Sequence, residues 1–182
     1  MVLGLFGGKG ADKPLEPTMS KDAFLSELDK MQTTFGIVST DAAGKNEPYG
    51  KIEATGRFLF EQVLKVGVSA NAITSKKEIH AAAMLGVVVV HCLGRNGGMS
   101  KTQLQFLLGK VPAYAFALAM DAEHKAVIGE AVPKAILGYA HKIRQTRFRN
   151  SVEAVEKNVT QFMLEKDPVY YANLAGDMAR FI

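Results

Sequence analysis

Residues 75–93 of this 182-residue chain read SKKEIHAAAMLGVVVVHCL. Ser75 and Glu78 have the spacing of a capping box, in which the serine side chain accepts a hydrogen bond from the glutamate N–H and the glutamate reaches back to the serine N–H. The valines at 87–90, taken alone, favour a β-strand. The cap, the alanines before the valines and the total length outweigh them, so this stretch predicts a helix over 79–93.

Helix signals recur on both sides of this segment. Ser20 precedes apolar residues at helical spacing, and Gly36 is placed to end that helix. Ser100 and the pair Asp167-Pro168 likewise indicate helix starts. No pair of strands is indicated anywhere. The sequence therefore predicts an all-α, single-domain bundle of about seven or eight helices with short connections.

Prolines and one asparagine guide the expected boundaries in the second half. Pro112 suits a first helical turn, so a bend at Gly109 is expected between two helices. Pro133 is expected to restart the chain as a helix that runs to about Phe148. The residues from Asn150 read NSVE, which matches a second capping box and predicts another helix start.

The composition, with 48% hydrophobic and 22% charged residues, is that of an ordinary soluble protein. Residues 1–19, rich in Gly and Pro, are predicted to form a flexible N-terminal arm, and 20–182 a single all-α domain. Two apolar runs, 81–90 and 111–120, are too short to span a bilayer and are predicted to be buried core helices. The chain shows no signal-peptide pattern, and its single Cys92 excludes an internal disulfide, so the expected location is the cytoplasm.

A basic tract between residues 134 and 149 supplies the net charge of +4. It contains no acid and holds five of the 22 Lys and Arg, so the other 17 nearly balance the 18 acidic residues. On one helix, at about 100° per residue, the tract forms a broad basic face. That face consists of Lys134, His141, Lys142, Arg144 and Arg149. Arg147 falls on the apolar side and is expected to be buried or half-buried with a carboxylate partner. The candidate partners are Glu130, Glu153 and Glu156.

Such a face either is simply solvated or binds an anionic surface. An acidic protein is the partner that we expect, recognised by charge complementarity. Nucleic acid is an alternative, although only Tyr139 and Phe148 add aromatic side chains and the basic excess is small for that class. Peripheral contact with anionic lipid, aided by Leu3, Leu5 and Phe6 of the arm, is a further alternative.

The turn over 94–100 is a second candidate anion site. Glycines there can take positive φ, and the N–H groups that open the next helix can hold an anion between Arg95 and Lys101. The turn lacks the second glycine and the preceding strand of a Walker A loop. A helix–turn–helix corner capped by Ser100 is therefore the ordinary interpretation.

No catalytic, metal-binding or cofactor-binding residue is predicted. His80 and His91 would lie about 16 Å apart along a helix axis, too far to share one ion. Cys92 lies in an apolar segment and is expected to be a packing residue. An enzyme or small-ligand carrier with a pocket between helices stays an alternative, because sites assemble from distant segments.

We therefore expect a non-catalytic helical protein that binds a macromolecule through its basic face. An adaptor, an inhibitor of the immunity type and a self-associating protein all fit this description, and the sequence does not indicate the oligomeric state. The predicted binding residues are Lys134, His141, Lys142, Arg144 and Arg149, with Arg95 and Lys101 at the turn.

Overall fold

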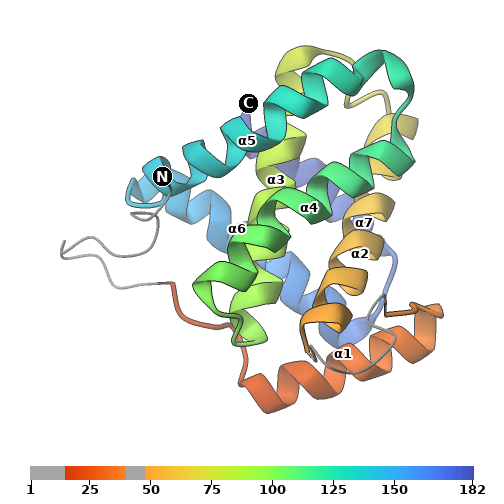
Figure 1. Ribbon diagram of the computed structural model, residues 1–182, viewed down its shortest axis with the longest axis vertical. Helices are drawn as coiled ribbons and strands as arrows, with labels where there is room; N and C mark the ends of the chain where they lie inside the picture. Colours follow the sequence, from red (N-terminus) through yellow and green to blue (C-terminus); the bar gives the residue numbers. More distant parts are fainter. Residues whose placement is uncertain (1–14, 40–47) are drawn as a thin grey trace.

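The computed structural model describes residues 15–39 and 48–182, and helices dominate both ranges (Figure 1). Seven α-helices and two short 3₁₀-helices follow one another in these ranges, which contain no strand. Their bounds are α1 Lys21–Phe35, α2 Tyr49–Ser69, α3 Lys76–Asn96, α4 Lys101–Ala119, η1 Ala122–His124, α5 Lys125–Lys142, α6 Thr146–Glu165, α7 Val169–Asp177 and η2 Met178–Phe181. The predicted all-α bundle of seven or eight helices is confirmed.

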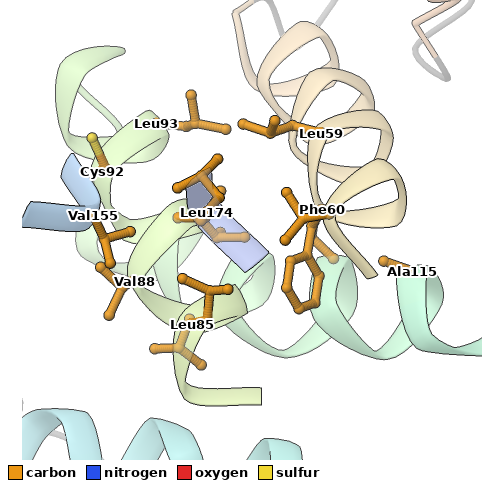
Figure 2. Packing of buried hydrophobic residues seen from close by; sticks show 14 of the residues in the cluster. Leu59, Phe60, Leu85, Val88, Cys92, Leu93, Ala115, Val155 and Leu174 are labelled. Atoms are coloured by element: carbon orange, nitrogen blue, oxygen red, sulfur yellow. The ribbon is translucent and has the colours of Figure 1, made fainter. Parts of the chain in front are cut away.

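α3 is the core helix of this bundle. It contacts α2, α4, α5, α6 and η2, and Figure 1 shows it passing through the middle of the molecule. Of its 21 residues, 16 are buried. Figure 2 shows Phe60 of α2, Val155 of α6 and Leu174 of α7 gathered around α3. The predicted segment 79–93 is therefore the centre around which the other helices are arranged.

The predicted capping box at the start of α3 is present. Ser75 Oγ accepts from the N–H of Glu78 at 3.3 Å, and Glu78 Oε2 accepts from the N–H of Ser75 at 2.8 Å. Backbone hydrogen bonds from Thr74 and Ser75 lower the pKa of Glu78 to about 2. The valines at 87–90 are all helical and buried, because burial in a packed core overrides a weak strand preference.

Two expected boundaries are wrong, because the prolines that suggested them lie inside helices. α4 runs through Pro112 and α5 runs through Pro133, so no bend at Gly109 separates two helices. A proline inside a helix removes one backbone hydrogen bond and costs about 3 kcal/mol. Burial of residues next to Pro112, such as Val111 and Phe116, offsets that cost in α4.

The boundary between α5 and α6 also differs from the prediction. The helix expected to run to Phe148 is divided between α5 and α6, and Asn150, the expected cap, lies inside α6. The Phe148 ring packs against Tyr139 and Phe181, at centroid distances of 6.0 and 5.7 Å. A straight helix would carry Phe148 about 13 Å beyond Tyr139, so the chain must turn for these rings to touch.

The two apolar runs of the sequence differ in burial. Residues 81–90 are all buried in α3. In the described ranges, α3 is also the one helix long and apolar enough to cross a membrane, and 83% of the relevant window is buried inside the bundle. Residues 111–120 are buried on one side only, since Tyr114 and Leu118 are 45% and 53% exposed. The expectation of a buried core helix is therefore wrong for the outer side of α4.

The described end of the predicted N-terminal arm contacts the helices. Leu15 and Met19 pack against the core, and Thr18 donates its N–H to Asn96 Oδ1 at 2.8 Å. Residues 1–14, which include Leu3, Leu5 and Phe6 of the lipid-contact alternative, lie outside the described residues.

α2 approaches α3 closely at Gly86, where a Cβ atom would lie 2.6 Å from two atoms of the Phe60 ring. We expect Gly86→Ala to lower the free energy of unfolding by about 1–3 kcal/mol, because a packed ring cannot move aside without strain. Gly129→Ala in α5 is the matched control, since a Cβ atom there meets nothing within 4 Å. It is expected to raise the same free energy by about 0.5–1 kcal/mol. Urea denaturation measures both changes, and a fully stable Gly86→Ala protein would contradict this packing.

Candidate functional site

The basic tract is divided between two helices, so the single basic face expected from the sequence does not exist. His141 and Lys142 lie in the last turn of α5, Arg144 in the connecting turn and Arg147 in the first turn of α6. All four side chains are exposed, and none has an ion-pair partner within residues 15–39 and 48–182. We call these four residues the basic corner; it lies at the left-hand junction of α5 and α6 in Figure 1.

Arg147 is exposed, so the expectation that it is buried with a carboxylate partner is wrong. The inward position was predicted for a single helix over 134–149. The chain turns after Lys142, and this turn changes the direction in which the later side chains point. Its neighbour Phe148 takes the inward position. The three glutamates expected as its partners pair with other cations, and they are Glu130, Glu153 and Glu156.

Two of the predicted binding residues are ion-paired with acids on their own helices. Lys134 is ion-paired with Glu130, and Lys76 Nζ lies 2.9 Å from the same carboxylate. Hydrogen bonds from Lys134 and Lys76 lower the pKa of Glu130 to about 2, so this carboxylate is charged at neutral pH. Arg149 Nε lies 3.4 Å from Glu153 Oε1. Both acids lie just outside the tract, which is therefore less positive than its own sequence indicates.

Arg95, predicted to flank an anion-binding turn, joins α3 to α6. Its Nη2 donates to Glu156 Oε1 at 2.6 Å, and the two side chains are only 12% and 5% exposed. Burial raises the pKa of Glu156, and the nearby guanidinium of Arg95 offsets part of the rise. The Nε and Nη1 atoms of Arg95 are buried and have no hydrogen-bond partner in the described part of the chain. Arg95 is thus an interior ion-pair residue and not part of the basic corner.

Lys101 is exposed at the start of α4, which Figure 1 shows apart from the basic corner. The turn before it is a helix–turn–helix corner capped by Ser100, as the sequence predicts. Ser100 Oγ accepts from the N–H of Gln103 at 3.3 Å, and Gln103 Oε1 accepts from the N–H of Ser100 at 3.1 Å. The cap therefore uses two of the N–H groups that would otherwise be available to an anion.

Sequence reasoning missed a buried polar cluster in the last turns of α3. The Tyr139 hydroxyl lies 2.7 Å from His91 Nδ1, and the ring centroids are 5.1 Å apart. Burial, and to a smaller extent Arg95, lowers the pKa of His91 to about 3, and burial raises the pKa of Tyr139. Both groups are therefore uncharged at neutral pH. The signal in the sequence was the spacing of His91 and Arg95, one turn apart and directly after the apolar run 81–90.

A second set of polar contacts ties the segment before α1 to the same end of α3. Asn96 Nδ2 donates to Thr18 Oγ1 at 3.0 Å, and the Thr160 hydroxyl donates to the same oxygen at 2.8 Å. A surface groove of about 290 Å³ lies beside these contacts. It is lined by Thr18, Glu153, Glu156, Lys157, Thr160 and Gln161.

The cluster holds a thiol that is not activated. Burial raises the pKa of Cys92 to about 12, and Asn96 Nδ2 lies 3.6 Å from its Sγ. A buried, protonated thiol packs as a small apolar side chain.

Among the residues that the structure describes, no group of three or more His, Cys, Asp and Glu side chains is placed to hold a metal ion. The described feature best suited to recognition is therefore the basic corner.

The Arg95–Glu156 pair supports a double-mutant test. We expect Arg95→Met to cost about 3–5 kcal/mol of unfolding free energy at neutral pH, because it leaves a carboxylate buried alone. Arg95→Met combined with Glu156→Met is expected to lie within about 2 kcal/mol of the wild type, since no charge is then buried. Denaturant titration of the single and double variants measures the coupling. Equal losses in both would contradict an interior ion pair.

His91 gives a pH-dependent prediction. Its pKa is about 3 in the folded protein and about 6.5 in an unfolded chain, so between these values the unfolded state binds one more proton. This group therefore contributes stability that is lost as the pH falls through that window, by about 1.4 kcal/mol per pH unit. His91→Gln keeps a polar side chain and removes the titration. The stability difference between wild type and variant, measured from about pH 6 to pH 4, is expected to change with that slope, and a constant difference would contradict it.

Comparisons of this chain with protein-family models, with curated proteins and with solved structures found no match.

Proposed function

We propose that this protein binds the acidic surface of another protein through the basic corner and does so without catalysing a reaction. One observation carries the proposal. His141, Lys142, Arg144 and Arg147 are exposed, close in sequence and without an ion-pair partner in the described ranges. Concentrated charge without counter-charges acts as a binding surface, whereas charge spread over the molecule mainly aids solubility.

The corner has the chemistry and the support that such a surface needs. Arg144 and Arg147 carry planar guanidinium groups, which can donate two parallel hydrogen bonds to one carboxylate. Phe148 anchors the start of α6 by packing against Tyr139 and Phe181, so the basic side chains project from a fixed backbone. Complementary charge would set the rate of encounter and the choice of partner more than the final affinity.

The positions of the aromatic side chains support a protein partner over nucleic acid. Proteins that bind single strands stack bases on exposed aromatic rings that lie among cations. Tyr139 is only 2% exposed, and the Phe148 ring packs against both Tyr139 and Phe181. The two aromatic residues that gave the nucleic-acid alternative its support are thus used in packing.

Charge reversal tests the proposal. We expect Lys142→Glu with Arg144→Glu to reduce capture of the partner from native extract by about tenfold or more, because like charges would then face each other. The matched control is Lys77→Glu with Lys125→Glu, which changes the net charge equally at two exposed sites at the starts of α3 and α5. The control is expected to capture as the wild type does, since an acidic residue near a helix start is favourable.

The measurement is affinity capture with quantitative mass spectrometry, at about 0.05 M and 0.5 M salt, with nuclease-treated extract in parallel. Thermal unfolding of each variant shows that it is folded. Capture that survives the reversal, or that disappears after nuclease treatment, would overturn the proposal. Equal losses in the reversal and in its control would also do so.

A further inference from the structure

The outer side of α4 is an apolar helix face that no described residue covers. Phe106 is 67% exposed, Tyr114 45% and Leu118 53%, and Ala113 and Ala117 are exposed between them. Most surface helices are polar on the side that faces water. α4 is apolar on its outer side as well, and contacts within the described bundle do not account for these exposed apolar side chains.

These residues form one continuous surface. At about 100° per residue, Phe106, Ala113 and Ala117 fall within one narrow stripe, with Lys110 beside them and Tyr114 next to it. We call Phe106, Lys110, Ala113, Tyr114, Ala117 and Leu118 the α4 face. Figure 1 shows α4 crossing the bundle diagonally, with α5 along one side and α2 along the other.

The charge beside the α4 face is positive. α4 contains no acidic residue. Lys110 Nζ lies 3.0 Å from Glu53 Oε1, Arg57 is hydrogen-bonded to the same oxygen, and Arg57 stacks 4.1 Å above the Tyr114 ring. Burial alone would raise the pKa of Glu53, but hydrogen bonds from Arg57 and Lys110 hold it below its usual value. One carboxylate thus serves two cations, which leaves one net positive charge, carried at the surface by Lys110 among the apolar side chains of the face.

The same charge argues against a second copy of the chain as the occupant, because two identical positive faces would repel each other. The shape argues against a lipid surface. A membrane-inserting face carries large apolar side chains along its whole length. Here Ala113 and Ala117 occupy the middle, and small side chains there allow another helix to approach closely.

We propose that the α4 face docks an amphipathic helix of a partner protein, whose apolar stripe lies over Ala113 and Ala117 and whose acidic side chains face Lys110, which is 56% exposed. This inference rests on the proposed function, since it names a binding mode for the same class of acidic partner. The basic corner would guide encounter, and the α4 face would supply the buried apolar area that gives affinity.

Defined peptides test this docking directly. The probe is a fluorescent peptide of about 18 residues, with leucines at helical spacing and glutamates on both flanks. A second peptide keeps the leucines and replaces every glutamate with lysine. Fluorescence anisotropy is expected to show binding of the acidic peptide and affinity weaker by about tenfold or more for the basic one.

Substitutions on the protein provide the second half of the test. Ala113→Gln adds bulk at the middle of the face without charge, and Phe106→Ser removes its largest apolar side chain; each is expected to weaken binding of the acidic peptide by about tenfold. Ala126→Gln is the matched control, because Ala126 is an exposed helical alanine on α5, outside the face. It is expected to leave the affinity unchanged.

Several outcomes would overturn the inference. They are binding of neither peptide, equal binding of both peptides, and Ala113→Gln and Phe106→Ser proteins that bind as the wild type does. Flotation with vesicles of phosphatidylcholine and phosphatidylserine that depends on Phe106, without peptide binding, would assign the face to a membrane instead. The extract assay separates the two proposals. If the Ala113→Gln protein captures the partner normally and the Lys142→Glu, Arg144→Glu protein does not, docking on the α4 face is rejected and the proposed function stands. The reverse pattern would reject the proposed function.

Discussion

The burial of α3 on every side is the constraint on which the rest of the structure depends. A helix without a solvent-facing stripe requires each neighbouring helix to present an apolar surface to it. Desolvation also limits the polar groups that such a helix can carry. Arg95 is tolerated because Glu156 pairs with it, and Asn96 because Thr18 does. These pairs also specify which parts of the chain lie beside the end of α3.

The distribution of charge follows from the same balance between solvation and pairing. Residues 101–152 contain eight Lys and Arg and three acids, whereas the other residues contain 14 and 15. Along regular helices, acids one turn away pair with two of these cations, since Glu130 binds Lys134 and Glu153 binds Arg149. The change of chain direction between α5 and α6 interrupts that helical spacing. Four exposed basic side chains without an ion-pair partner in the described ranges therefore lie close together in sequence there.

The sequence predicted what local chemistry determines and failed where distant contacts decide. The caps at Ser20, Ser75 and Ser100 need only residues three positions away, and all three are present. The prolines at 112 and 133 are local helix breakers, but burial of neighbouring side chains outweighs their cost, which one segment alone does not reveal. The basic face was expected on one helix because the packing of Phe148 on a ring from the C-terminus is invisible in a local window. One misplaced turn reversed the expected direction of Arg147 and changed the composition of the candidate site.

The depth at which Cys92 lies makes the protein a convenient subject for chemical labelling. Its thiol is the only one in the chain, and it is fully buried and protonated. A cysteine introduced at an exposed position would then react with a fluorophore or cross-linker while the native thiol stays silent. In the unsubstituted protein, the rate at which a thiol reagent modifies Cys92 would measure how often α3 separates from its neighbours. The buried Cys92 side chain is unreactive in the folded protein, so its rate of modification reports the rate at which the core opens.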